Sequence, residues 1–174
     1  ALPIKEGVNP LFLFLTSILQ AFPKKGSMST EDIFWSYQQS TKAVLGWSTA
    51  MLVFDGLYDP SYQKRNLLFQ NRYRQSKTLC ELVQQATQFK LQPSLNPCSQ
   101  DELIKFWTAT RAAHLKIMKE LIARFYRVKF SSWENLMWRH SISPKNVARI
   151  LLSVLLRQHN YSNPFYTDLA KLYM

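Results

Sequence analysis

The stretch SQDELIKFWTATRAAHLKIMKELIARFYRV, residues 99–128, is the segment whose pattern decides the fold most clearly. Ser99 is followed three residues later by Glu102, the spacing of a capping box at the start of a helix. Beyond this pair, apolar residues recur every three or four positions and cover one broad side of a helix. That side contains Trp107, His114, Leu115, Ile117, Met118, Leu121, Ile122, Phe125 and Val128. The pattern predicts a long amphipathic helix over residues 100–129.

Comparable start signals occur along the rest of the chain. Pro is favoured as the first residue of a helix when the residue before it can cap the free backbone N–H groups. Such signals are Asn9-Pro10, Asp59-Pro60, Ser143-Pro144 and Asn163-Pro164, with a second capping box at Ser131 and Glu134 and a looser one at Ser29 and Asp32. Since strand-like alternation is missing, we predict helices over residues 10–22, 30–55, 60–90, 100–129, 132–140, 144–158 and 164–173.

These segments predict an all-α protein. Its 174 residues, 47% of them hydrophobic, are enough to bury a sizeable core. No linker, repeat or low-complexity tract divides the chain, so we predict one compact helical domain over residues 1–174. Short loops favour a mainly up-and-down bundle of about six to seven helices. We expect the helices over 60–90 and 100–129 at its centre, with the apolar helix over 30–55 packed against them.

The charge balance points to an acidic partner. The chain has 22 Lys and Arg against 11 Asp and Glu, which gives a net charge of +11. Such an excess suits an acidic protein surface, nucleic acid or anionic lipid headgroups. Cations concentrate opposite the apolar side of the helix over 100–129 and alternate with aromatic residues near the start of the helix over 60–90. The candidate binding residues are Lys105, Lys116, Lys119, Arg124 and Arg127, together with Lys64, Arg65 and Arg72.

Each of these two groups has an ordinary structural interpretation as well. The cations on the helix over 100–129 can be a solvated face without a partner. The mixtures of Tyr or Phe with Lys or Arg resemble single-strand binding surfaces, in which bases stack on aromatic rings beside phosphate contacts. Amphipathic helices with aromatic residues in the core and cations on the surface show the same mixture, and we favour that interpretation for the helix over 60–90.

Motifs for catalysis, metal binding or cofactor binding are absent from the sequence. No phosphate-binding glycine loop, nucleophile elbow or zinc-protease motif occurs, and the few carboxylates are not spaced as an acid/base pair. His114 stands out because it falls on the apolar side of its helix, with Thr110 one turn before it. A buried histidine usually only donates a hydrogen bond to a nearby oxygen. We therefore predict no catalytic residue, metal or cofactor, and keep an enzyme or small-ligand carrier centred on His114 as a minor alternative.

The remaining features of the sequence concern the cellular compartment of the protein. Cys80 and Cys98 lack the spacing of a metal site, and we predict that both are free thiols. No apolar stretch is long enough to cross a bilayer, since the longest, residues 11–22, covers only about 18 Å as a helix. The location of the protein is unknown, with an intracellular one favoured. The start at Ala1 leaves open that a targeting peptide has been removed.

Taken together, the sequence favours a non-catalytic binding or assembly module. It would dock through a basic, aromatic-rich helical surface onto an acidic partner within a larger complex. The main alternative is a nucleic-acid-binding protein that uses the helix over 100–129 and the start of the helix over 60–90. The oligomeric state is not indicated by any pattern in the sequence.

Overall fold

The computed structural model describes residues 11, 13–15, 17–18, 21–23 and 26–127 of the chain. The helices that we predict beyond residue 129, and the start signals at Asn9-Pro10, Ser131, Ser143 and Asn163, lie outside the described residues.

The chain divides into two compact units, residues 1–121 and 122–174. The fold described below is that of the first unit. Since most of the second unit lies outside the described residues, the single domain over 1–174 remains a prediction, as do the number of helices and their up-and-down order.

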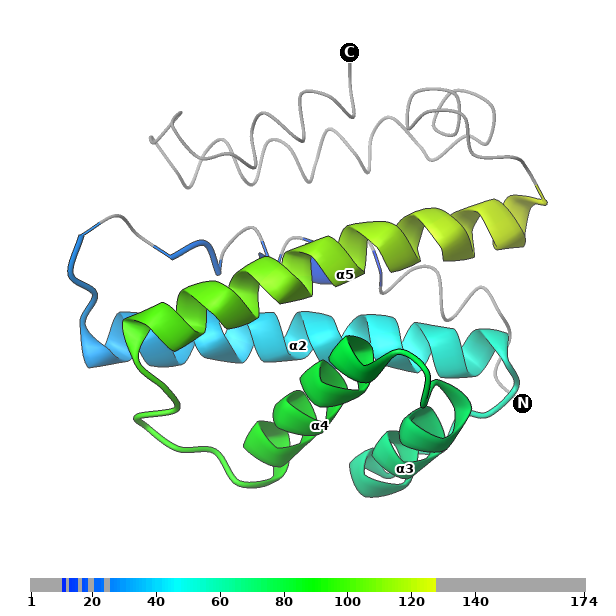
Figure 1. Ribbon diagram of the computed structural model, residues 1–174, viewed down its shortest axis with the longest axis horizontal. Helices are drawn as coiled ribbons and strands as arrows, with labels where there is room; N and C mark the ends of the chain where they lie inside the picture. The colour runs from blue at the N-terminus through cyan, green and yellow to red at the C-terminus, as the bar shows by residue number, and fades with distance from the viewer. Residues whose placement is uncertain (1–10, 12, 16, 19–20, 24–25, 128–174) are drawn as a thin grey trace, which may run out of the picture. The chain divides into compact units, whose positions relative to one another are not determined.

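The described part of the chain is helical and contains no strand (Figure 1). Helical residues at 11, 13–15 and 17–18 precede the longer helices, so the all-α class is confirmed. The longer helices are α2, Thr30–Phe54; α3, Tyr62–Arg72; α4, Lys77–Leu91; and α5, Gln100–Tyr126.

Helix α2 has the start and the end that its sequence predicts. The backbone N–H of Asp32 donates to the Ser29 hydroxyl at 3.1 Å, which caps the first turn. At the other end Gly56 adopts a φ of 73°, the left-handed conformation that glycine reaches without strain. The N–H groups of Gly56 and Leu57 donate to the carbonyls of Val53 and Leu52 at 3.1 and 2.8 Å, the bonding pattern of a Schellman motif.

The prediction of one helix over residues 60–90 is wrong, because residues 73–76 break it into α3 and α4. The two helices pack against each other and both contact α2. A single straight helix could not pack its two halves against each other, as α3 and α4 do. Helix α3 also begins two residues after Pro60: Ser61 is its cap, and the Ser61 N–H donates to the Asp59 carboxylate at 2.8 Å.

Helix α2 is therefore the central helix, in place of the segment over 60–90. In Figure 1, α3 and α4 lie on one side of α2 and most of α5 lies on the other. Tyr37 of α2 connects these layers, since its ring stacks on Phe106 of α5 at 4.7 Å and meets Phe89 of α4 edge-on at 4.8 Å. Such aromatic contacts add to the area buried between helices.

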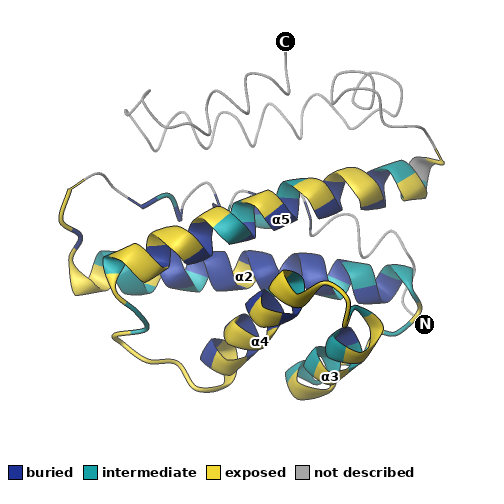
Figure 2. Cartoon of the chain, viewed as in Figure 1, coloured by how far each residue is buried: buried dark blue, intermediate teal, exposed yellow. Residues whose placement is uncertain are grey.

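Helix α5 begins with the capping box that its sequence predicts. The Ser99 N–H donates to the Glu102 carboxylate at 2.8 Å, and the Glu102 N–H donates to the Ser99 hydroxyl at 3.3 Å. The hydrogen bonds that the Ser99 N–H and the Ser99 hydroxyl donate to the Glu102 carboxylate lower the pKa of Glu102. Along residues 100–121, Figure 2 shows the buried side of α5 turned toward α2 and the exposed residues on its opposite side.

The segment before α2 is held to α5 by two buried side chains. The Trp107 indole N–H donates to the Ile18 carbonyl at 3.0 Å, and Nε2 of His114 lies 3.0 Å from the Leu11 carbonyl oxygen. Trp107, Ile18, Ala21 and Ala43 form a buried cluster against which Phe14 and Phe22 pack. In the part of the chain that the structure describes, no helix has both the length and the apolar composition that crossing a membrane requires.

Candidate functional site

Three of the predicted binding residues lie on the exposed side of α5. Lys105, Lys116 and Lys119 are exposed, whereas Trp107 and Met118 on the opposite side are buried. Since a helix rises about 1.5 Å per residue, these lysines extend over about 21 Å. Lys105 and Lys116 are separated by close to three full turns, which puts their Cβ atoms on the same side. We call Lys105, Lys116 and Lys119 the α5 basic stripe.

Arg124 and Arg127, which the sequence adds to this stripe, belong to the second compact unit. Both are exposed, and Arg127 follows the last helical residue with a φ of 54°. Their membership of a common binding surface remains a prediction.

The predicted binding residues of α3 form intramolecular contacts. The Arg72 Nε donates to the Asp55 carboxylate at 2.7 Å, and this carboxylate raises the pKa of Arg72. The guanidinium of Arg65 donates to the carbonyls of Asp59 and Pro60 at 2.9 and 3.1 Å. Lys64 Nζ lies 3.9 Å from the carboxylate of Asp59. Arg65 and Arg72 thus fix the ends of α2 and α3, and α3 does not share a face with the α5 basic stripe (Figure 1).

The aromatic side chains near these cations also belong to the core. Phe69 is fully buried and packs against Trp47 and Tyr73, with ring centroids 5.8 and 4.6 Å away. The Tyr73 hydroxyl donates to the Asp55 carboxylate at 3.0 Å. Within the described residues, the exposed aromatic side chains are Trp35 and Tyr58, neither of which lies on α5. The exposed side of α5 therefore carries Lys105, Lys116 and Lys119 with Glu120 among them and, among its described side chains, no exposed aromatic residue.

His114 is fully buried in the interior of α5. Because the Leu11 carbonyl can only accept, Nε2 carries the hydrogen of that bond. Burial lowers the pKa of His114 to about 4, so the ring is neutral at physiological pH. Its Nδ1 and the hydroxyl of Thr110 have no hydrogen-bond partner among the described residues. The contact with Leu11 is the backbone hydrogen bond that we expect of a core histidine.

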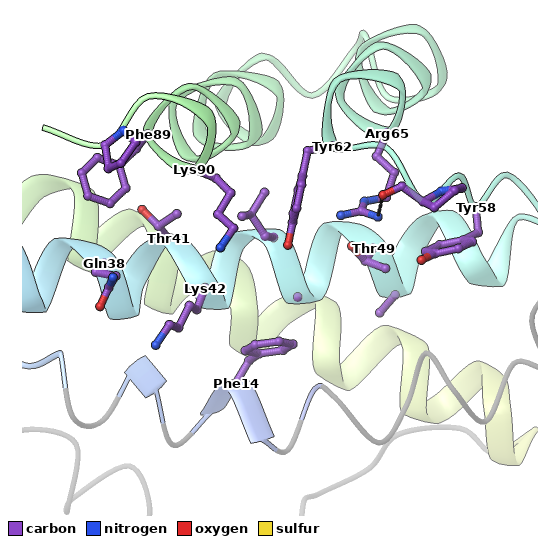
Figure 3. A pocket seen from close by; sticks show the side chains of 15 residues that line it. Phe14, Gln38, Thr41, Lys42, Thr49, Tyr58, Tyr62, Arg65, Phe89 and Lys90 are labelled. Atoms are coloured by element: carbon purple, nitrogen blue, oxygen red, sulfur yellow. Dashed lines mark hydrogen bonds between the residues drawn. The ribbon is translucent and has the colours of Figure 1, made fainter.

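A pocket that the sequence analysis did not predict lies along α2 (Figure 3). It has a volume of about 480 Å³. One side of α2 forms its floor, with Gln38, Thr41, Lys42, Leu45, Gly46, Thr49 and Ala50. Its walls come from the segment before α2 and from the α3 and α4 regions, with Phe14, Tyr58, Pro60, Tyr62, Arg65, Phe89, Lys90 and Pro93. The only available signal in the sequence is the recurrence of polar residues at helical spacing within the otherwise apolar α2.

The charged side chains that line this pocket are all positive. Lys42, Arg65 and Lys90 line it, and none of the described lining residues is Asp or Glu. The Arg65 guanidinium lies over the Tyr62 ring at 4.4 Å from its centroid, and the Lys90 ammonium lies 5.7 Å from the same centroid. Tyr62 thus holds two cations beside the cavity through cation–π contacts.

One polar group in the pocket lacks a hydrogen bond. Thr41 is 2% exposed, and its hydroxyl has no hydrogen-bond partner among the described residues. Burying a hydroxyl without a partner costs about 1–3 kcal/mol. The Thr41 hydroxyl is therefore a polar group whose hydrogen-bonding capacity is unused.

The other candidate chemistry is accounted for. No group of three or more His, Cys, Asp or Glu side chains in the described ranges could hold a metal ion. Cys80 and Cys98 are free, which confirms the prediction that they form no disulfide. Burial raises the pKa of both thiols, that of Cys98 to about 11, so neither is activated as a nucleophile.

No known protein family, curated protein or solved structure matches this chain.

Proposed function

We propose that the protein is a non-catalytic binding module that docks onto an acidic protein surface through the α5 basic stripe. The observation that supports this most directly is the alignment of Lys105, Lys116 and Lys119 along the exposed side of a helix whose other side is buried. These lysines are held by a rigid element and do not form the core. Complementary charge of this kind accelerates association with an acidic partner and selects against basic ones.

A second candidate, nucleic-acid binding, is supported by the charge of residues 60–80. This segment contains Lys64, Arg65, Arg72, Arg74 and Lys77 and no carboxylate. Lys64, Arg74 and Lys77 are exposed. We rank this candidate second because Arg65 and Arg72 are engaged within the fold, and because the neighbouring Phe69 is buried and unavailable for base stacking.

Two variants with the same charge change separate these candidates. In the first, Lys105→Glu and Lys116→Glu reverse two cations of the α5 basic stripe. In the second, Arg74→Glu and Lys77→Glu reverse two exposed cations in the region of α3 and α4. Each variant is used to capture partners from a lysate of the source cells, with and without nuclease, and each captured complex is then washed with increasing salt.

The proposal predicts nuclease-resistant protein partners that the α5 variant loses and the Arg74/Lys77 variant retains. Nucleic-acid binding instead predicts loss of capture after nuclease treatment, with binding that falls steeply as salt rises. Equal losses for the two variants would mean that net charge, rather than the α5 basic stripe, is responsible, and would contradict the proposal. Both variants should melt within a few degrees of the wild type, because exposed charges usually contribute less than about 0.5 kcal/mol each.

A further inference from the structure

The pocket along α2 has the size and the wall chemistry of a small-molecule site. Its volume of about 480 Å³ is comparable to that of the clefts that hold small organic ligands. Phe14, Leu45 and Phe89 supply apolar wall surface, and Tyr62 projects between α3 and α2 (Figure 3). A flat apolar body could contact these side chains.

The positive charges of the pocket favour a ligand with a negative charge. Lys42 and Lys90 project toward the space beside α2 (Figure 3). Arg65 lies on the opposite side of the Tyr62 ring from Lys90 (Figure 3). No carboxylate among the described lining residues balances them. An anionic group would therefore gain charge-assisted hydrogen bonds from Lys42 or Lys90, whereas a cation would be repelled.

Thr41 is an independent indication of a ligand. Thr41 is one of the residues that line the pocket, and its buried hydroxyl lacks a hydrogen-bond partner among the described residues. Native structures rarely leave such a group unsatisfied. An acceptor atom on a bound ligand would satisfy it.

We propose that this pocket binds a small organic anion with a flat, aromatic body, whose charged group pairs with Lys42 and Lys90 and whose polar atom accepts from Thr41. The site lies apart from the α5 basic stripe and does not depend on the docking function. An experiment that contradicts the docking proposal would therefore leave the pocket proposal unaffected, and the reverse also holds.

A matched pair of probes tests the charge requirement. 8-Anilinonaphthalene-1-sulfonate has an aromatic body with a sulfonate, and N-phenyl-1-naphthylamine has the same body without the charge. Calorimetric or fluorescence titration of the full chain should show saturable binding of one sulfonate per protein. The neutral amine should bind about tenfold more weakly or worse, since it forms no ion pair. Equal affinity for both probes would overturn the proposal.

Charge reversals locate the site. Lys42→Glu and Lys90→Glu should each weaken sulfonate binding by about tenfold or more, because each places a negative charge beside the anion. Lys105→Glu makes the same charge change on α5, outside the pocket, and should alter the affinity by less than about twofold. Circular dichroism checks that each variant is folded, and Lys90→Gln replaces Lys90→Glu if the latter is not. Similar losses at Lys105 and Lys90 would show that the probe responds to overall charge and would contradict the site.

Thr41→Val supplies a readout that an ordinary structural role would not give. Valine keeps the shape of threonine and removes the unsatisfied hydroxyl, so the free protein should melt roughly 2–4 °C higher. The same variant should bind the sulfonate several-fold more weakly, while Thr41→Ser, which keeps a hydroxyl, should bind it nearly as the wild type does. A lower melting temperature with unchanged affinity would show that Thr41 has no role in ligand binding.

Discussion

At the scale of single residues, His114 connects the burial of a side chain to the stability of the protein. Its ring is fully buried, and burial lowers its pKa to about 4 from an ordinary value of about 6.5. Between these values the unfolded chain binds a proton at His114 that the folded chain does not. The contribution of His114 to the free energy of unfolding is therefore fully present above pH 6.5, and it is lost as the pH falls toward 4.

We expect the free energy of unfolding to decrease by about 3 kcal/mol through His114 between pH 6.5 and pH 4. Urea unfolding at a series of pH values measures this loss. His114→Gln is the matched control, because the glutamine amide can donate to the Leu11 carbonyl but does not titrate. The variant should show a flatter dependence on pH in this window; identical slopes for the two proteins would contradict the lowered pKa.

Trp107 combines a large apolar surface with one hydrogen bond. It is 6% exposed, its ring meets Phe22 edge-on at 5.2 Å, and its N–H donates to the Ile18 carbonyl. Trp107→Ala should lower the free energy of unfolding by about 3–5 kcal/mol. Trp107→Phe keeps much of the apolar contact and should lose only about 1–3 kcal/mol, for the unpaired carbonyl and the smaller ring. Chemical denaturation of the two variants would refute this if Ala and Phe had the same small effect.

At the scale of elements, the contact between α2 and the segment before it depends on Gly46. A Cβ atom at this position would overlap the ring of Phe14. Replacing an interior helical glycine by alanine ordinarily stabilises a helix by about 1 kcal/mol. Here the steric overlap should dominate, since insertion into a packed contact costs about 1–3 kcal/mol.

We therefore expect Gly46→Ala to destabilise the wild-type protein and to stabilise a Phe14→Ala variant. Removing the Phe14 ring vacates the space that the new methyl group needs. The higher helix propensity of alanine should then raise the free energy of unfolding. A double-mutant cycle of unfolding free energies measures this change of sign. A stabilising Gly46→Ala in the wild-type background would show that Phe14 does not occupy this position.

The break between α3 and α4 shows why the sequence predicted one helix where two form. Residues 73–76 contain neither Gly nor Pro, the residues that usually mark an interruption. The turn is held by longer-range contacts instead, among them the Gln70 side chain donating to the Cys80 carbonyl at 2.8 Å. The available local cue was the polar run from Arg74 to Thr78, in which Ser76 occupies a capping position.

At the scale of the whole molecule, the sequence predicted the features that depend on residues close together in the chain and missed those that depend on tertiary packing. The caps at Ser29 and Ser99 depend on residues a few positions apart, and the structure confirms them. The exposure of Lys105, Lys116 and Lys119 follows from helical periodicity alone. The pocket could not be predicted in this way, because its walls come from separate segments that tertiary packing brings together along α2.

The two cysteines make the protein a convenient background for site-directed labelling. Because the pKa of Cys98 is raised to about 11, only roughly three in ten thousand of these thiols are ionised at pH 7.5, compared with about one in ten for an ordinary thiol. Cys80 is buried, and the pKa of its thiol is raised as well. The thiolate is the nucleophile that adds to a maleimide, so a cysteine introduced at an exposed position, for example by Lys105→Cys, should react long before either native one. Fluorophores or spin labels can thus be attached to this chain without first replacing its own cysteines.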